Sequence, residues 1–450
     1  MANIQAFRGL RYDLSQVGSL TSVVAPPYDV IDGKMQDSLY DRNEFNVVRL
    51  ILNRGDDLVG DETVYDRAAQ LYKFWRRDGV LKRENEGVIY VYHQSFTHEG
   101  RRFERRGFMA RVRLEPFGSG RIYPHEETHA KAKEDRFKLN LACRANLSQI
   151  FGIFPDPNNE AQTILENAIE DQTPSQATDD NGVEHKMWIV KDPVAIAAVA
   201  NLMGPKPIYI ADGHHRYETA CNIQKAVRES EHITVAEGEH PVDYVLMMCV
   251  SMQDPGMAIL PTHRLFRGIS PIDSAVFIAK LGLAFDCEIA GTGAGSAKDV
   301  WEQIAFEDEQ STMGFYCRLD NNWVLARLTT AGKSMMVDFA PTQSEEWRSL
   351  GVALLHRLVI SQLLGYGQLP TPKYVHSVAE VTTGLTEGDS AGRDATGQEG
   401  SGQHFELACL VMPATVQHVK EISEHGERMP AKSTYFYPKL LSGLVINPFE

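Results

Sequence analysis

The sequence lacks the features of secreted, membrane-spanning and zinc-binding proteins. Its six cysteines are scattered and include no Cys-x-x-Cys pair, which is typical of reduced thiols rather than of a disulfide framework or a zinc site. No apolar run approaches the length of a membrane span, and the first residues have no apolar signal-peptide core. These absences predict a cytoplasmic protein without a membrane partner.

Basic charge is also scarce, because 45 Lys and Arg residues face 60 Asp and Glu residues and the formal net charge is −15. A general nucleic-acid-binding protein usually has a basic balance or a basic stripe, so we do not expect a nucleic-acid partner. What the chain does have is 450 residues and a hydrophobic content of 43%. That length and that content suit a globular protein of two or three domains.

Polar residues concentrate in one short stretch near the middle of the chain. Residues 207–210 are an apolar, β-branched and aromatic run, which predicts a buried strand. Asp212 and Gly213 then predict a tight turn, and apolar residues at helical spacing predict a helix from about Arg216. Backbone N–H groups and the helix dipole at such a corner favour an anion such as a phosphate.

The side chains at this corner strengthen that interpretation. Arg216 offers a bidentate grip on a phosphate, and His214 and His215 offer hydrogen-bond donors or exchange protons. The alternative is an ordinary structural corner, because a single glycine is a weaker phosphate signal than a full glycine-rich loop.

Three segments carry a family resemblance. They are Asp-Gly-His-His-Arg-Tyr-Glu-Thr-Ala at 212–220, Pro-Pro-Tyr-Asp-Val-Ile at 26–31 and Lys-Ser-Thr-Tyr-Phe-Tyr-Pro-Lys at 432–439. Together they resemble the uncharacterised bacterial and archaeal family catalogued as domain-of-unknown-function family ten-fifteen. The Gly-His-His-Arg-Tyr core is also similar to turns of sulfiredoxins and of ParB-like free-serine kinases, which grip nucleotide phosphates at a helix N-terminus. His214 stands where sulfiredoxins have cysteine, which argues against sulfinic-acid repair.

A second polar cluster lies at residues 123–138, which we expect to form a loop and then a helix from about residue 131. It matches the family pattern His-Glu-x-Thr followed by Lys-x-Asp-Arg, and the resemblance singles out six residues. They are His125, Glu127, Thr128, Lys133, Asp135 and Arg136. The spacing of His125 and His129 imitates the HExxH zinc motif, but no third ligand is evident, so we expect no protein-held metal.

Two smaller groups complete the candidates. His263 and Arg264 follow another apolar run, and active sites commonly collect at the ends of such strands. Residues 432–434 and Lys439 offer a further anion surface, with a tail packed by aromatic side chains as the alternative.

We expect an α/β protein with mixed sheets, with an α+β arrangement as the alternative. The resemblance implies a ParB/sulfiredoxin-like nucleotide-binding core. Residues 46–52 read as a strand and residues 173–186 as a polar loop. The expected parts are an N-terminal αβ domain at 1–120, a central domain at 121–268 and a C-terminal αβ region at 269–450. A glycine-rich polar stretch at 382–404 predicts a flexible loop inside the last part.

These observations favour a nucleotide-dependent phosphotransferase that acts on a small-molecule hydroxyl, such as that of a hydroxy-amino acid. Phosphoryl transfer needs charge neutralisation, positioning and a carboxylate that accepts the hydroxyl proton. The expected cofactor is ATP or ADP with Mg²⁺, for which Asp212 is one candidate ligand. The catalytic candidates are Asp29, Glu127 and His214. The cofactor-binding candidates are Asp212, Gly213, His215, Arg216, Lys133, Arg136, His263 and Arg264.

Two other functions fit parts of the same pattern. One is a non-catalytic sensor or adaptor that binds a nucleotide or a phosphorylated metabolite at the same corner. The other is a ParB-like nucleic-acid protein, against which the net charge of −15 counts. The sequence leaves the substrate and the oligomeric state open.

Overall fold

The computed structural model describes residues 3–55, 63–128, 130–388 and 404–450. It divides into two compact units. Unit 1 comprises Met1–Pro124, Thr128–Met257 and Pro438–Glu450, and unit 2 comprises His125–Glu127 and Ala258–Tyr437. Over the described residues, no helix has both the length and the apolar character that a membrane crossing requires.

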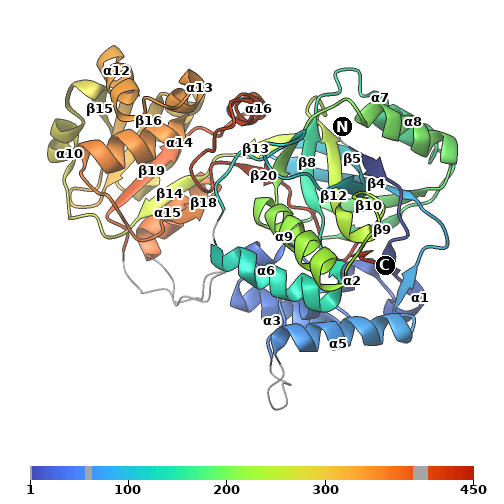
Figure 1. The fold of residues 1–450 in the computed structure, drawn as a ribbon. Helices are drawn as coiled ribbons and strands as arrows, with labels where there is room; N and C mark the ends of the chain where they lie inside the picture. The colour runs from blue at the N-terminus through green and yellow to red at the C-terminus, as the bar shows by residue number, and fades with distance from the viewer. Residues whose placement is uncertain (1–2, 56–62, 129, 389–403) are drawn as a thin grey trace. The chain divides into compact units, whose positions relative to one another are not determined.

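Unit 1 is built on a mixed nine-stranded sheet with the strand order β6-β11-β8-β12-β5-β4-β10-β9, and β1 pairs with β5 off this path (Figure 1). The pairs β11–β6 and β12–β8 are parallel, and the other pairs are antiparallel. The strands are β1 (Ile4–Gln5), β4 (Ile89–His98), β5 (Arg101–Arg113), β6 (Ile122–Tyr123), β8 (Ile150–Phe154), β9 (Ser175–Thr178), β10 (Glu184–Val190), β11 (Ile208–Asp212) and β12 (Tyr244–Ser251). Continuous apolar runs such as those of β8 and β12 are buried throughout, as expected for strands covered on both faces.

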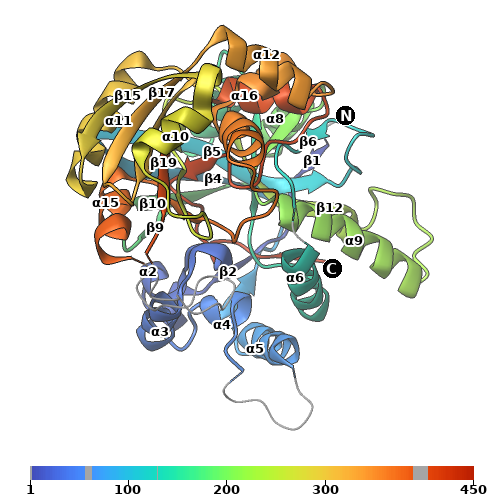
Figure 2. The same cartoon turned by 90° about the vertical axis from the view of Figure 1, so that its left-hand side faces the viewer.

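Helices and short strands surround this sheet. The helices are α1 (Leu14–Val17), α2 (Leu20–Val23), η1 (Tyr28–Val30), α3 (Gly33–Arg42), α4 (Val48–Ile51), α5 (Val64–Arg77), α6 (Ala130–Cys143), α7 (Glu160–Asn167), α8 (Pro193–Met203), α9 (His214–Ser230) and η2 (Pro241–Asp243). The short pairs are β2 (Leu10–Tyr12) with β3 (Leu81–Arg83) and β7 (Ala145–Asn146) with β21 (Asn447–Pro448). Helices α3, α4, α5 and α6 form a contiguous group (Figure 2), and α6 also packs against α9.

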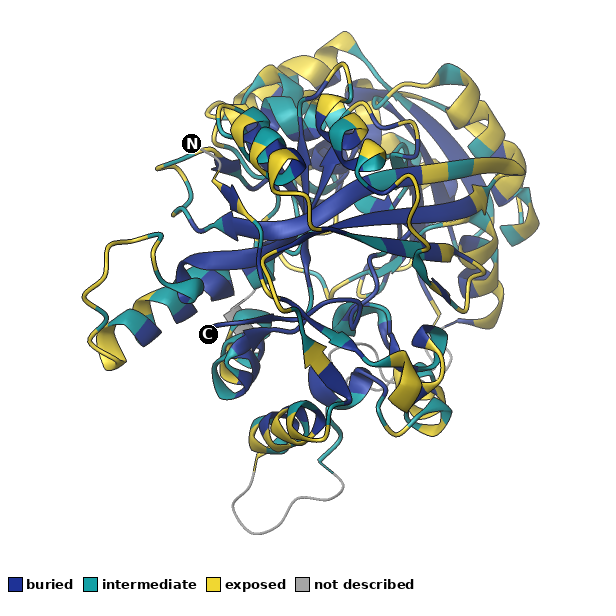
Figure 3. Cartoon of the chain, turned by 90° about the vertical axis from the view of Figure 1, so that its right-hand side faces the viewer, coloured by how far each residue is buried: buried dark blue, intermediate teal, exposed yellow. Residues whose placement is uncertain are grey.

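The last segment of the chain runs through the interior of unit 1. All residues from 440 to 449 are buried, and Figure 3 draws the ribbon that leads to the C-terminus in dark blue. Ile446 exchanges two main-chain hydrogen bonds of 2.9 Å with Leu10, and Ser442 donates one of 2.8 Å to Ala25. We call residues 438–450 the C-terminal strap.

Unit 2 contains an antiparallel six-stranded sheet with the order β15-β17-β16-β19-β14-β18. Its strands are β14 (His263–Phe266), β15 (Phe285–Thr292), β16 (Thr312–Cys317), β17 (Asn322–Leu328), β18 (Lys373–Val375) and β19 (Leu407–Val411), beside the pair β13 (Ala258–Leu260) and β20 (Tyr435–Tyr437). Its helices are α10 (Ser274–Leu281), η3 (Gly282–Ala284), η4 (Ala294–Ser296), α11 (Ala297–Glu307), α12 (Thr330–Phe339), α13 (Glu345–Ser349), α14 (Gly351–Ala353), the π-helical η5 (Leu354–Leu363), α15 (Val378–Glu387) and α16 (Val416–Glu424). The expected mixed α/β fold is thus confirmed.

Three local predictions are wrong. Residues 46–52 contain the helical turn α4 instead of a strand, because the Asn46 side chain accepts from the N–H of Val48 and starts the turn. Residues 173–186 include β9 and the start of β10 instead of only a loop. The main chain of β10 pairs with both β4 and β9, and this pairing extends into the polar residues. Residues 382–387 belong to α15, which begins with a capping box between Ser377 and Glu380. Residues 389–403 of the predicted loop lie outside the described part of the chain.

Candidate functional site

The corner between β11 and α9 is a one-residue connection. Strand β11 ends at Asp212 and helix α9 begins at His214, so only Gly213 lies between them. Gly213 has φ 97° and ψ 28°, a left-handed conformation that other residues adopt only with strain. A Cβ there would also lie 3.0 Å from the guanidinium of Arg216. The glycine therefore brings the start of α9 and the Arg216 side chain close together.

Asp212 links two cations at this corner. Its Oδ2 accepts from Nη2 of Arg216 at 2.6 Å, and its Oδ1 accepts from Nζ of Lys439 at 2.7 Å. Arg216 also donates through Nη1 to the main-chain oxygen of Gln149. The three charged side chains are only 11%, 23% and 14% exposed for Arg216, Asp212 and Lys439, so solvent screens their interaction weakly. We call these three residues the Asp212 cluster.

Buried polar side chains fix the strap at the point where Lys439 leaves it. The main-chain oxygen of Lys439 accepts from Nε2 of Gln94 at 3.0 Å, and that of Pro438 accepts from Arg105. Arg105 is fully buried and donates to Oε1 of Gln94 from Nε at 3.1 Å. Burial lowers the pKa of Arg105 to about 10, which leaves it charged at neutral pH. The backbone of Pro438 and Lys439 is therefore held by two buried polar side chains of unit 1, of which Arg105 is charged.

A lysine of helix α6 forms an ion pair with a glutamate of helix α9. Nζ of Lys133 lies 2.6 Å from Oε2 of Glu218 on α9, and Oγ1 of Thr128 donates to the same oxygen at 2.9 Å. Lys133 thus reaches the first turns of α9, where its charge is paired with that of Glu218.

The same helix meets the segment that contains Asp29. The guanidinium of Arg136 lies 3.9 Å from the centre of the Tyr28 ring, and Nη1 of Arg136 donates to the main-chain oxygen of Ile51 at 2.7 Å. Arg136 also pairs with Asp135. Asp29 follows Tyr28 in η1 and is partly buried. Unit 1 therefore joins the motif segments around Asp29, Lys133 and Arg216 through a chain of direct contacts.

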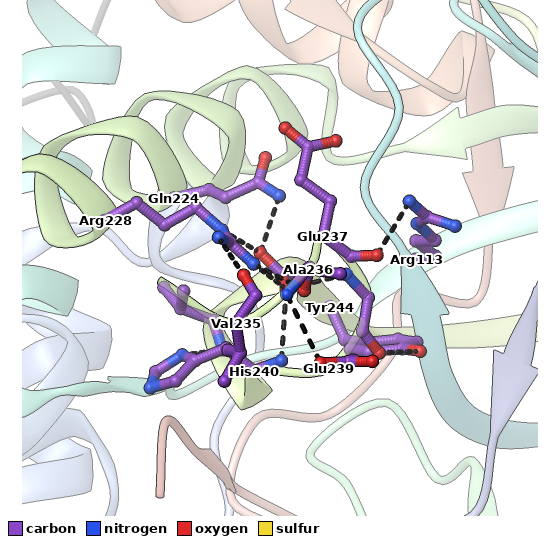
Figure 4. Close-up of polar contacts among 12 residues, drawn as sticks. Arg113, Gln224, Arg228, Val235, Ala236, Glu237, Glu239, His240 and Tyr244 are labelled. Carbon is purple, nitrogen blue, oxygen red and sulfur yellow. Dashed lines mark hydrogen bonds and ion pairs between the residues drawn. The ribbon is translucent and has the colours of Figure 1, made fainter. Parts of the chain in front are cut away.

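The far end of α9 is anchored independently (Figure 4). Arg228 donates to both carboxylate oxygens of Asp243, at 2.7 and 2.6 Å, and Gln224 and the N–H groups of Gly238 and His240 donate to the same carboxylate. Burial by itself raises the pKa of Asp243, but these bonds together lower it well below its ordinary value. This anchor holds the axis of α9 and hence the orientation of its first turn.

The remaining candidates lie in unit 2. Glu127 is exposed there, whereas its neighbour Glu126 accepts from the N–H groups of Ser433 and Thr434 at 3.1 and 3.0 Å. His125 is fully buried and its Nε2 lies 2.9 Å from Oγ1 of Thr434. His129 lies outside the described residues, and among the described ones no group of three or more His, Cys, Asp or Glu side chains could hold a metal ion.

His263 and Arg264 lie within β14, although the sequence suggested that they follow a strand, because their main chains pair with β18 and β19. Both side chains are fully buried. Nδ1 of His263 accepts from the N–H of Val411 at 3.3 Å, and burial lowers the pKa of His263 to about 3. Arg264 donates to Nε2 of His356 at 3.0 Å and to main-chain oxygens. In unit 2 these side chains therefore serve the packing of β14.

Sequence reasoning missed the residues that fix the strap. Lys439 was expected on a separate anion surface, but it pairs with Asp212, which lies 227 positions away. Gln94, Arg105 and Gln149 were not singled out at all. Their one signal in the sequence is a polar residue inside or next to a buried strand, and that signal does not identify a partner.

A family model for proteins of unknown function, DUF1015, matches residues 4–353. The chain belongs to the DUF1015 family. This match confirms the family resemblance, and it includes the motif segments at 26–31 and 212–220. No curated protein matches this DUF1015 chain in sequence.

Several solved structures are similar to the DUF1015 chain at low sequence identity. A mutant free serine kinase in complex with AMP is 9% identical with a TM-score of 0.31, and the match covers 70% of this chain and 84% of that one. A conserved hypothetical protein from Pyrococcus furiosus is 10% identical with a TM-score of 0.31, over 71% and 89% of the two chains. Truncated SbnI from Staphylococcus aureus is 11% identical with a TM-score of 0.32, over 74% and 85%.

Proposed function

We propose that unit 1 binds the phosphate of a nucleotide at the β11–α9 corner and transfers a phosphoryl group to the hydroxyl of a small molecule. The observation that carries this proposal is the arrangement of Arg216 and Lys439 on the two oxygens of Asp212, at the start of a 17-residue helix. The resemblance of the Gly-His-His-Arg-Tyr turn to nucleotide-binding turns supports it.

The electrostatics of the corner favour an anion. Arg216 and Lys439 contribute two positive charges and Asp212 one negative charge, so the Asp212 cluster has a formal charge of +1. The start of α9 adds roughly half a positive charge from aligned peptide dipoles. All three side chains are mostly buried, and charges in such a setting interact more strongly than they do in bulk water.

The phosphoryl acceptor needs a base, and Asp29 is our first candidate. It sits in η1, beside the Tyr28 ring that packs on Arg136, and the two prolines before it restrict the backbone. Its role is to accept the hydroxyl proton of the acceptor. His214, at the first position of α9, is the second candidate, whereas Glu127 lies in unit 2 and is not assigned to this site.

ATP or ADP with Mg²⁺ is the proposed cofactor and would supply the phosphoryl group. Asp212 does not fit as a direct Mg²⁺ ligand, because both of its oxygens accept hydrogen bonds from cations. In this proposal Mg²⁺ arrives with the phosphates of the nucleotide, and Arg216, Lys439 and the first N–H groups of α9 hold those phosphates.

A non-catalytic nucleotide sensor is the second candidate function. The observation that favours it is that Asp212, Glu218 and Asp135, the acids nearest to the motif cations, each pair with a cation. A carboxylate that is already engaged with a cation is less available to receive the proton of a substrate hydroxyl.

Thermal melting of the purified protein with AMP, ADP and ATP, each with and without Mg²⁺, tests the binding step. A ligand that binds the native state raises the melting temperature. The bound nucleotide is then incubated with pooled hydroxy-amino acids, and mass spectrometry follows a phosphorylated product. Binding with turnover supports the phosphotransferase, and binding without turnover supports the sensor. If no nucleotide binds, both proposed functions are overturned.

A further inference from the structure

One segment of unit 1 is basic although the whole chain is acidic. Residues 64–83 contain six Lys or Arg residues and two Asp residues, whereas the chain has a formal net charge of −15. The segment covers helix α5 and strand β3. It shares no residue with the β11–α9 corner, so its charge has to be explained separately.

A cavity of about 370 Å³ lies where α5 meets the β2–β3 pair. Three of its cations are three and four residues apart on α5 and therefore share one face of that helix, while a fourth comes from β3. Two buried leucines supply an apolar wall, and a cavity with charges of one sign beside such a wall concentrates the electric field. The lining residues are Leu10, Lys73, Arg76, Arg77, Leu81 and Arg83. We call this space the α5 cavity.

Among the described residues, acidic side chains pair with two of the four cations. Arg77 pairs with its neighbour Asp78 at 2.7 Å, and Arg76 pairs with the side chain of Glu450, the last residue of the strap. The α5 cavity thus already receives one carboxylate from this chain, which shows the kind of group that its cations bind.

The other two cations, Lys73 and Arg83, form no ion pair with an acidic side chain in the described part of the chain. Lys73 is exposed, and Nη2 of Arg83 donates to the main-chain oxygen of Glu450. Burial, and after it the charge of Arg83, lower the pKa of the buried Arg111 to about 10. The positive charges of this region therefore repel one another, and an anion in the cavity would relieve that repulsion.

The size of the cavity indicates how large an anion it holds. Small-molecule sites measure about 300–1,000 Å³, so the α5 cavity lies near the lower end of that range. A phosphate group has five heavy atoms, and a water-sized atom takes about 30 Å³ in a liquid, so one phosphate leaves room for a second. Arginine forks match phosphate oxygens in pairs, and a lysine adds a point charge.

We propose that the α5 cavity is a further anion site of unit 1, that it takes a compact anion with two linked phosphate groups such as pyrophosphate, and that the Glu450 carboxylate competes with this ligand for Arg76. A small anion is favoured over a nucleic acid, because a long polyanion would extend over the surface of a chain whose net charge is −15. The proposal does not depend on nucleotide binding at the β11–α9 corner.

The first test is calorimetric titration of the full chain with inorganic pyrophosphate at constant ionic strength. Lys73→Met keeps most of the side-chain volume and removes the charge, and Lys73→Arg restores the charge. The control is Lys191→Met, because the Lys191 side chain is 60% exposed. Glu450→Gln removes the competing carboxylate, and its control is Glu184→Gln, whose glutamate side chain is 52% exposed.

We expect Lys73→Met to bind pyrophosphate about fivefold more weakly than the wild type, the upper end for an exposed ion pair, because the ligand has several negative charges. Lys73→Arg should recover the affinity. Glu450→Gln should bind more tightly than the wild type, and both controls should be unaltered. Inorganic phosphate should bind the wild type more weakly than pyrophosphate does.

Amine acylation followed by mass spectrometry locates the bound anion. Pyrophosphate should slow the acylation of Lys73 and leave that of Lys191 unaltered. A wild type that does not bind pyrophosphate, or equal affinities of Lys73→Met and Lys191→Met, overturns the proposal. Inorganic phosphate that binds as tightly as pyrophosphate overturns the ligand class.

The same titrations keep this site apart from the corner. Pyrophosphate binding that Arg216→Lys weakens and Lys73→Met leaves unaltered belongs to the corner, and it overturns the proposal for the α5 cavity while the proposed function stands. Conversely, a chain that binds no nucleotide but binds pyrophosphate with the expected dependence on Lys73 and Glu450 supports the α5 cavity.

Discussion

Arg216 has two tasks that the sequence could not separate. Its guanidinium pairs with Asp212 at 2.6 Å and also donates to the main-chain oxygen of Gln149, so the planar fork spans two fixed acceptors. Lysine keeps the charge but cannot reach both acceptors in the same geometry. Arg216 is therefore a structural link as well as a candidate phosphate ligand.

We predict that Arg216→Lys lowers the free energy of unfolding by about 1–3 kcal/mol without ligand, the usual range for a lost charged hydrogen bond. Binding of AMP should weaken as well. Chemical denaturation with and without AMP measures both effects, and Arg102→Lys is the control because the Arg102 side chain is 75% exposed. Unaltered stability together with unaltered affinity would show that the bonds from Arg216 to Asp212 and Gln149 contribute neither to folding nor to AMP binding.

Asp29 gives a prediction about chemistry alone. Asp29→Asn keeps the size and the hydrogen-bonding capacity of the side chain but cannot accept a proton. If Asp29 is the base, nucleotide affinity should stay nearly constant while turnover falls by a factor of about 10² or more. Steady-state rates and titrations on the same preparation distinguish the two. Full turnover in this variant would shift the role to His214, for which His214→Gln is the matching change.

The candidate site was predictable only where its residues are close in sequence. Asp212, Gly213 and Arg216 form one local pattern of strand, turn and helix, and the structure places them accordingly. Lys439 could not be joined to them, because hydrophobic periodicity and turn signals contain no information about partners 227 residues apart. Long-range pairing is decided by the packing of the whole unit.

At the scale of elements, β14 of unit 2 should make stability depend on pH. The folded pKa of His263 is about 3 because of its burial, whereas an unfolded histidine has a pKa of about 6.5. As the pH falls below 6.5, the unfolded chain takes up a proton that the folded chain excludes. The stabilisation is therefore complete above pH 6.5 and is lost progressively toward pH 3. His356, with a pKa also lowered to about 3 by burial, acts in the same direction.

We expect the free energy of unfolding to decrease between pH 7 and pH 5, and His263→Asn to reduce that decrease. Asparagine is suited to the test because its oxygen can take over the bond that Nδ1 of His263 accepts from Val411. Urea unfolding at the two pH values measures the difference. His425→Asn is the control, since the His425 side chain is 51% exposed. Equal pH dependence in the wild type and His263→Asn would contradict this account.

Element prediction succeeded where periodicity and flanking signals agreed. The strand expected at 207–210 is β11, and the helices expected from about residues 131 and 216 are α6 and α9. Residues 46–52 look like a strand by composition, but the Asn46 side chain caps a helical turn there. In that case a single side-chain hydrogen bond outweighs the β propensity of the apolar residues.

At the scale of the molecule, unit 1 is completed by the end of the chain. Its sheet takes strands from residues 4 to 251, which spans both of the first two expected domains, and the strap then fills the interior. Arg111 donates to Oδ1 of Asn447 at 2.6 Å and to the main-chain oxygen of Pro448 at 2.8 Å, so a second buried arginine depends on the strap. Burial lowers the pKa of Arg111 to about 10.

Ending the chain after Leu440 should therefore unfold unit 1, although Lys439 itself is retained. The deletion exposes the surfaces that residues 441–449 cover, and it leaves Arg111 and the main-chain groups of Leu10 and Ala25 without their partners. Each buried unsatisfied group costs about 1–3 kcal/mol, and a folded protein has only about 5–15 kcal/mol in total.

Circular dichroism and limited proteolysis measure the outcome, and removal of Glu450 alone is the control because this residue is exposed. We expect the control to melt cooperatively near the wild-type temperature and the longer deletion to lose its cooperative transition. A deletion variant that melts like the wild type would show that the strap lies on unit 1 without stabilising it. The support that positions Lys439 would then have to come from Gln94 and Arg105 alone, because these two residues contact the strap at 438 and 439, before the deleted part begins.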